Sequence, residues 1–191
     1  MGATHKIGIF GYGGMAGIHA DKVLKFYDRV DIKGIYDINP ERMKAARDNG
    51  WNTYASCEEL LADKETDMVL VATTNDAHKE LCIKALESGK NVICEKPATM
   101  TSKDLEDIIE VAKKCGKVFT VDQNRRTNRD FVNMKRAVES GLIGDVYLIE
   151  SRVEGSRGLP AGWRTEKEKG GGMMLDWGVH LIDQIMYMID E

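Results

Sequence analysis

Five short apolar runs, each followed by a polar stretch with helical spacing, most constrain what this chain can fold into. The runs lie at residues 6–11, 31–37, 67–73, 91–95 and 117–122. The stretches between them, such as 76–89 and 101–116, carry apolar residues at helical spacing and end at glycines. Strands that alternate with helices of about a dozen residues form βαβ units. We therefore expect an α/β fold, a doubly wound parallel sheet with helices on both faces.

The pattern changes near residue 123. A helix is predicted over 128–144, and residues 145–155 alternate apolar and polar side chains as a strand does. A second helix follows the glycine run at 170–172. We therefore expect a first domain at 1–122 and the start of an incomplete α/β second domain at 123–191.

The segment GYGGMAG (11–17) directly follows the first predicted strand and fits the pattern G-x-G-x-x-A. Gly11 permits the tight turn, Gly13 lets a pyrophosphate approach the backbone, and Ala16 lets the helix pack on the strand. Such a pattern alone also occurs in ordinary strand–helix turns, but its position between a strand and a helix favours a Rossmann-type dinucleotide site. The other predicted cofactor-binding residues of this loop are Tyr12, Gly14 and Met15. The apolar face of the following helix is formed by Ala16, Ala20, Val23 and Tyr27.

Asp37 ends the second strand, 21 residues after Ala16, where an acid meets the ribose hydroxyls of a dinucleotide. A carboxylate repels a 2′-phosphate, so Asp37 favours NAD. Arg42 is close enough in sequence to leave NADP open. The alternative is that Asp37 only caps the helix that starts at Asn39-Pro40.

Two further strand ends carry polar groups where ligands bind in a doubly wound sheet. Thr73, Thr74 and Asn75 follow the third apolar run, and they could equally be turn and helix-capping residues. Glu95 and Lys96 follow the fourth run. Lysine is usually solvated surface, but Pro97 constrains the backbone of Lys96 and so directs its side chain.

The last helix is apolar around most of its circumference, which predicts a buried helix. Its main polar line is Asp176, His180 and Asp183, at spacing i, i+4 and i+7. A buried acid–histidine line needs partners or a function. The alternative is a core histidine bonded to one of the two acids. A metal site is not expected, because no further His or Cys cluster accompanies these residues. The apolar positions are Leu175, Val179, Ile182, Met186 and Ile189.

Five segments together resemble the Gfo/Idh/MocA oxidoreductase family, in family order and over essentially the whole chain. The segments are GYGGMAG, YDINPER, ATTNDAH, CEKPAT and GWRTEKEKGGGMMLDWGVHLID. The resemblance implies an N-terminal NAD(P)-binding Rossmann domain. It also implies a C-terminal α/β domain that carries the substrate site, with sugars, polyols or inositols as substrates.

The same resemblance implies roles for individual residues. Lys96, Asp176 and His180 match the catalytic positions and, with Arg125, the substrate-binding positions. Lys96 would hydrogen-bond the reacting oxygen, and His180 would act as the general base because an unperturbed imidazole has a pKa of about 6.5. Asp176 would orient these groups. Further cofactor-side positions are matched by His78, Glu95, Asn124, Trp163 and Arg164.

The expected reaction moves a hydride between a carbinol carbon and a nicotinamide cofactor, NAD with NADP possible. Two other functions stay open. One is a glycosidase or epimerase that oxidises its substrate transiently and recycles bound NAD. The other is an inactive or regulatory nucleotide-binding fragment, against which the presence of Lys96, Asp176 and His180 argues.

Composition excludes several partners. A net charge of −4 argues against nucleic acid, and no run approaches the roughly 18 apolar residues of a membrane span. The four cysteines are spread without a C-x-x-C pair, which favours reduced thiols and a cytoplasmic location. The resemblance implies more chain after the last helix than this sequence has. We therefore expect a truncated protein, a complementing chain, or a homo-oligomer that pairs the 145–155 strand.

We predict that residues 1–122 fold and bind dinucleotide without the rest of the chain, because all five predicted strands lie within them. A fluorescence titration of this fragment with NADH should saturate. Absence of binding by a folded fragment would contradict the prediction.

Overall fold

The computed structural model describes residues 4–24, 27–155, 158 and 161–189. The chain divides into two compact units, Met1–Val121 (the first unit) and Asp122–Glu191 (the second unit). None of the described helices is long and apolar enough to cross a bilayer.

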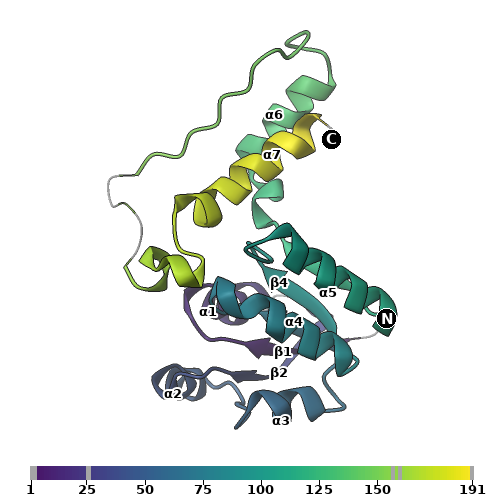
Figure 1. The fold of residues 1–191 in the computed structure, drawn as a ribbon, viewed down its shortest axis with the longest axis vertical. Helices are drawn as coiled ribbons and strands as arrows, with labels where there is room; N and C mark the ends of the chain where they lie inside the picture. Colours follow the sequence, from purple (N-terminus) through teal and green to yellow (C-terminus); the bar gives the residue numbers. More distant parts are fainter. Residues whose placement is uncertain (1–3, 25–26, 156–157, 159–160, 190–191) are drawn as a thin grey trace. The chain divides into compact units, whose positions relative to one another are not determined.

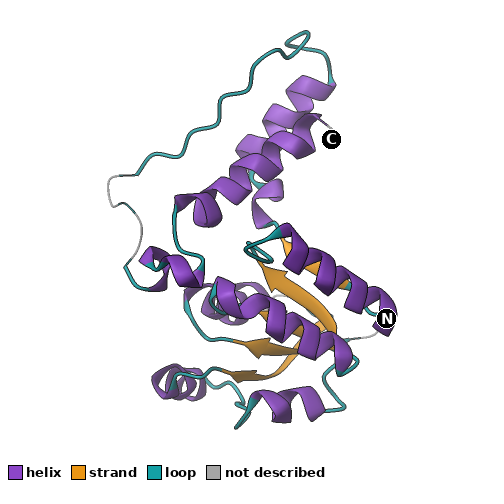
Figure 2. Ribbon diagram, in the orientation of Figure 1, coloured by secondary structure: helices purple, strands orange, loops and turns teal. Residues whose placement is uncertain are grey.

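The first unit is organised by one five-stranded sheet (Figure 2). The strand order is β2-β1-β3-β4-β5, so the chain reverses its direction of travel across the sheet after β2. β1 pairs in parallel with β2 and β3, and β3 pairs in parallel with β4. The predicted doubly wound sheet is confirmed. Its strands are β1 (His5–Phe10), β2 (Val30–Tyr36), β3 (Met68–Val71), β4 (Asn91–Glu95) and β5 (Phe119–Asp122).

Helices of the first unit cover both faces of the sheet, and α4 and α5 lie side by side (Figure 1). Most of these helices lie where the sequence predicted a helix. Tyr27, expected on the apolar face of the first helix, lies outside any helix, and its N–H donates to the Leu24 carbonyl at 3.0 Å. The elements are α1 (Gly14–Ile18), η1 (His19–Val23), α2 (Pro40–Asp48), α3 (Cys57–Ala62), η3 (Asn75–Ala77), α4 (His78–Glu87) and α5 (Ser102–Cys115).

Alternation along the strands produces two cores. Phe10 packs in one core, with Leu60 of α3 and Leu86 of α4. Its neighbour Ile9 packs in the other, with Ala16 of α1. Successive side chains of a strand point to opposite faces, so both faces of this sheet are buried and its strands read as continuous apolar runs.

α3 is absent from the helices predicted from the sequence. Ser56 caps this helix by accepting a hydrogen bond from the Glu59 N–H at 3.1 Å, and the Glu59 carboxylate accepts from the Ala55 N–H. The signal was present, because Ser-x-x-Glu is the sequence of a capping box.

The second unit is mainly a pair of packed helices, α6 and α7 (Figure 1). Phe131 of α6 packs on Tyr187 of α7 with ring centroids 6.2 Å apart. Arg126 forms a two-pronged ion pair with Asp183. The elements are η4 (Asn124–Thr127), α6 (Arg129–Glu139), η5 (Trp163–Thr165), η6 (Lys167–Lys169), η7 (Met174–Gly178) and α7 (Val179–Ile189).

Three expectations for the second unit are wrong. The helix predicted to reach residue 144 ends at Glu139, because Gly141 takes a left-handed conformation at φ 71°. Residues 145–155 form no strand, since the described residues of this unit provide no neighbouring strand to pair with. The last helix is not buried: within α7 only His180 is, while Ile182 and Met186 are each 48% exposed.

Candidate functional site

The glycine loop that follows β1 is held close to the end of β3. Gly11 has φ 95°, and a Cβ built there would lie 2.4 Å from the Ala72 carbonyl oxygen, so no other residue fits. A Cβ on Gly13 would have no atom nearer than 3.7 Å, that atom being Arg42 Nη1. Gly11 is therefore needed for packing between strand ends, whereas Gly13 keeps the loop surface open to a ligand. The adjoining Gly14 and Met15 form the first turn of α1, and Ala16 packs in the core.

Asp37 joins this loop to the start of α2. Its Oδ2 accepts from the Tyr12 N–H at 2.7 Å, and its Oδ1 accepts from the Asn39 N–H at 2.8 Å. The cap of α2 is Asn39, whose Oδ1 accepts from the Glu41 N–H at 2.8 Å, so the capping alternative for Asp37 is wrong. Asp37 instead joins the capping residue to the glycine loop. Arg42 Nη1 lies 3.4 Å from Oδ2.

A cavity of about 200 Å³ lies between these residues and the end of β3. Thr73 and Thr74 line it, and Thr74 precedes η3 without making a side-chain capping bond. Asn75, which opens η3, is buried. The open glycine loop, the carboxylate and the apolar walls fit the adenosine half of a dinucleotide. The lining residues are Phe10, Gly11, Tyr36, Asp37, Ile38, Arg42, Thr73, Thr74, Ala77, Glu80 and Leu81.

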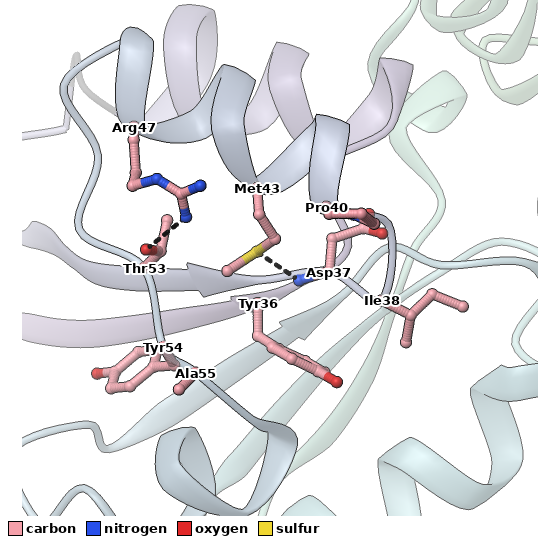
Figure 3. Close-up of a pocket in the computed structure, with 9 residues that line it drawn as sticks. All are labelled: Tyr36, Asp37, Ile38, Pro40, Met43, Arg47, Thr53, Tyr54 and Ala55. Carbon is pink, nitrogen blue, oxygen red and sulfur yellow. Dashed lines mark hydrogen bonds between the residues drawn. The ribbon is translucent and has the colours of Figure 1, made fainter.

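A second cavity, of about 440 Å³, adjoins the first and shares Tyr36, Asp37 and Ile38 with it (Figure 3). In this cavity the Arg47 guanidinium donates to the Thr53 hydroxyl at 3.4 Å. The two arginines of α2 therefore line different cavities, Arg42 the first and Arg47 the second.

The turn after β4 brings Glu95 and Lys96 to the carboxyl edge of the same sheet. Glu95 is buried; its Oε1 lies 2.6 Å from His19 Nε2, and its Oε2 accepts from the Lys96 N–H at 3.3 Å. The Lys96–Pro97 peptide bond is cis. Sequence reasoning missed His19, because no local pattern links residues 76 positions apart.

His78 supports the other side of this turn. Its Nδ1 lies 2.8 Å from the Pro97 carbonyl oxygen and must donate to it, because a carbonyl only accepts. Burial lowers the pKa of His78 below its usual 6.5, while the bond to Pro97 opposes that shift. The imidazole, 1% exposed, is therefore neutral and packed behind the turn.

In the second unit, the glycine run at 170–172 packs against the segment that contains Trp163 and Arg164. A Cβ on Gly171 would lie 2.5 Å from the Arg164 carbonyl oxygen, and the Gly172 N–H donates to that same oxygen at 2.9 Å. This loop sets Arg164 Nε at 3.4 Å from Asp176 Oδ1. The Arg164 guanidinium also stacks on the Trp163 ring, 4.5 Å from its centroid.

The remaining predicted residues of the second unit lie around Trp177. His180 is buried, with its ring edge-on to Trp177 at 6.2 Å. Arg125 stacks over Trp177 at 4.2 Å, and its carbonyl accepts from Gln184 at 2.9 Å. Asn124 begins the short η4 helix that contains Arg125. Lys96 belongs to the first unit, and Asp176 and His180 belong to the second.

Two family models match the chain. That of the GFO/IDH/MocA oxidoreductases with an NAD-binding Rossmann fold matches residues 5–123. That of the GFO/IDH/MocA C-terminal domain matches residues 131–191. Together they span both units.

Individual relatives agree with these models. Myo-inositol 2-dehydrogenase of Thermotoga maritima is 30% identical over 97% of this chain and 55% of its own length. D-glucoside 3-dehydrogenase of Escherichia coli is 31% identical over 91% of this chain and 52% of its own. A crystal structure of an NAD-binding protein from Listeria innocua is 48% identical, with a TM-score of 0.96 over 98% of this chain and 54% of that one. The chain thus spans about half the length of these relatives.

We predict that Arg42→Ala weakens NADPH binding about tenfold and changes NADH binding less than about threefold, since a charged hydrogen bond to phosphate contributes about 1.5 kcal/mol or more. The Arg42 side chain is 46% exposed, so its pair with Asp37 is weak and its guanidinium is available to a 2′-phosphate. Fluorescence titrations with both cofactors measure this. Arg47→Ala is the matched control, because Arg47 bonds Thr53 in the other cavity. Equal effects of the two substitutions would contradict the prediction.

We predict that His78 makes the protein less stable in mild acid. A histidine whose folded pKa is lowered contributes stability that is complete above its unfolded pKa, about 6.5, and is lost as pH falls toward the folded value. His78→Asn keeps a donor for Pro97 but does not titrate. Between about pH 7 and 5, the melting temperature of the wild type should therefore fall more than that of the variant. Parallel pH profiles would refute this.

Proposed function

The chain belongs to the GFO/IDH/MocA oxidoreductase family, and on this basis we propose that it carries the nicotinamide dinucleotide site and the catalytic side chains of a sugar or polyol dehydrogenase. One observation carries the proposal. The glycine loop, Asp37 and the Glu95–Lys96 turn all follow strands of one parallel sheet and meet at its carboxyl edge. Ligands of doubly wound sheets bind at that edge.

Cofactor binding is assigned to the first unit. The open backbone around Gly13 would receive the pyrophosphate, Asp37 the ribose hydroxyls, and the cavity beside Thr73 and Thr74 the adenine. The bound nicotinamide supplies hydride acceptance and donation at its ring. Asp37 favours NAD, and Arg42 extends the site to NADP.

Lys96 is proposed to bind the reacting oxygen of the substrate. Its ammonium would stabilise the negative charge that develops there as the hydroxyl proton leaves. The turn that carries Lys96 is bonded on both sides, through Glu95 and through Pro97, which restricts the directions its side chain can take.

His180 and Asp176 are proposed to handle the proton and to orient the substrate. His180 is the base, because an imidazole accepts protons near neutral pH. Asp176 is held beside the guanidinium of Arg164, with Oδ1 3.4 Å from Nε. Its carboxylate oxygens can accept hydrogen bonds from substrate hydroxyls. Arg125 is proposed as a further substrate contact.

The names of the relatives support the substrate class. Myo-inositol 2-dehydrogenase and D-glucoside 3-dehydrogenase are named for the dehydrogenation of an inositol and of a sugar derivative. We propose the same class for this chain. We also propose that residues 1–122 are the cofactor-binding domain and 123–191 contribute to the substrate side, and that the protein works in the cytoplasm as a homo-oligomer or with a complementing chain.

The test is NAD⁺ reduction, followed at 340 nm, with myo-inositol and methyl glucosides. Lys96→Met should lower turnover at least about 100-fold, as loss of a charge-stabilising group does, while NADH binding stays within about threefold. Lys103→Met is the control, because its side chain is 70% exposed on α5. Substrate turnover without net NADH formation would favour the NAD-recycling alternative. Polyol oxidation that Lys96→Met retains in full, or absence of NADH binding by the wild type, would contradict the proposal.

A further inference from the structure

A buried carboxylate links two functional segments of the first unit. Glu95 is 4% exposed, and each of its two oxygens has a partner. Oε1 lies 2.6 Å from Nε2 of His19, whose side chain is 12% exposed. Oε2 accepts from the Lys96 N–H at 3.3 Å.

Burying a carboxylate is unfavourable unless hydrogen bonds or opposite charge replace the lost water. An ionised carboxylate offers only acceptor atoms, so the His19 imidazole is the donor in this pair. At 2.6 Å the contact is short, as charge-assisted hydrogen bonds are. His19 therefore determines where the carboxylate lies, and the carboxylate in turn bonds the backbone of Lys96.

The two partners come from distant parts of the chain. His19 opens η1, a π-helical turn that continues the helix begun at Gly14. π-Helical turns are rare and are found mostly at functional sites. Glu95 is the last residue of β4. The pair thus ties the helix that follows the glycine loop to the turn that carries Lys96.

We propose that His19 is a positioning residue for Lys96, acting through the Glu95 carboxylate. Glu95, expected from the sequence to contact the cofactor, is on this account part of the support of the lysine turn. This proposal rests on the proposed function in one respect, the binding of the reacting substrate oxygen by Lys96. It adds two residues, His19 and Glu95, that hold the backbone from which the Lys96 side chain extends.

His78 supports the same turn from its other side, through the Pro97 carbonyl, and interacts electrostatically with Glu95, as Cys94 does. Asp122 adds a second carboxylate, with an oxygen within 4.8 Å of the facing atoms of His19 and Glu95. The His78 imidazole also bonds the Thr73 backbone, whereas His19 bonds the carboxylate that holds the Lys96 N–H. Substitutions of His19 and of His78 are therefore expected to have different effects on Lys96.

The experiment measures the ionisation of Lys96 directly. The full chain is reductively methylated with ¹³C-formaldehyde, and the Lys96 signal is assigned by its loss in Lys96→Met. His19→Leu removes the donor to Glu95, whereas His19→Gln keeps an N–H at the reach of Nε2. Without the donor from His19 the carboxylate no longer has one position, so His19→Leu should change the measured Lys96 pKa by roughly half a unit or more. His19→Gln should restore the wild-type value.

A second variant keeps the test decisive if His19→Leu does not fold. Glu95→Gln preserves the shape of the side chain and removes its charge, so the Lys96 pKa should fall by roughly one unit. A melting curve accompanies each variant. Altered stability with an unchanged Lys96 pKa in both folded variants would show a purely structural pair and overturn the proposal.

NADH titration of the unmodified proteins separates this inference from the proposed function. If the wild type does not bind NADH, the proposed function fails, whatever the lysine does. If the wild type binds NADH and the Lys96 pKa does not respond to Glu95→Gln, the positioning role fails and the cofactor site stands. His78→Asn is the matched control and should leave the Lys96 pKa unchanged.

Discussion

The hydrogen bond from the Tyr12 N–H to the Asp37 carboxylate, 2.7 Å long and buried, joins the ends of β1 and β2. Because Asp37 also accepts from Asn39, the same carboxylate places the start of α2 against the glycine loop. Gly11 makes this approach possible by leaving room for the Ala72 carbonyl at the end of β3. Three strand ends are thus held together by one acid and one glycine, and the cavity of about 200 Å³ lies beside them.

The turn that carries Lys96 is also held by hydrogen bonds between residues distant in sequence. Two histidines from different helices hold its backbone, His19 through Glu95 and His78 through Pro97. His78 and Glu95 are buried polar groups, which a core tolerates only with partners. In the second unit the glycine run positions a side chain in a similar way. Gly171 and Gly172 pack against the Arg164 carbonyl, and the Arg164 side chain lies beside Asp176.

The sequence predicted the sheet because its strands are buried on both faces and read as apolar runs, which needs no knowledge of distant contacts. It could not predict the partner of Glu95, because 76 residues separate it from His19. Nor could it predict that 145–155 is not a strand, since alternation shows only that a segment can pair, and pairing needs a neighbour. The exposure of the apolar residues of α7 could not be predicted for the same reason. Periodicity shows that a helix is apolar, but not which other element packs against it.

The central claim is that the first unit binds a nicotinamide dinucleotide at the edge built around Asp37. An ¹⁵N–¹H correlation spectrum of the labelled chain, recorded during titration with NAD⁺, tests it most directly. The account predicts saturable shifts of the backbone amide signals of Gly11, Tyr12 and Thr74, with little change at Arg47 and Thr53 of the neighbouring cavity. Shifts confined to Arg47 and Thr53, or none at the glycine loop at saturating NAD⁺, would contradict it.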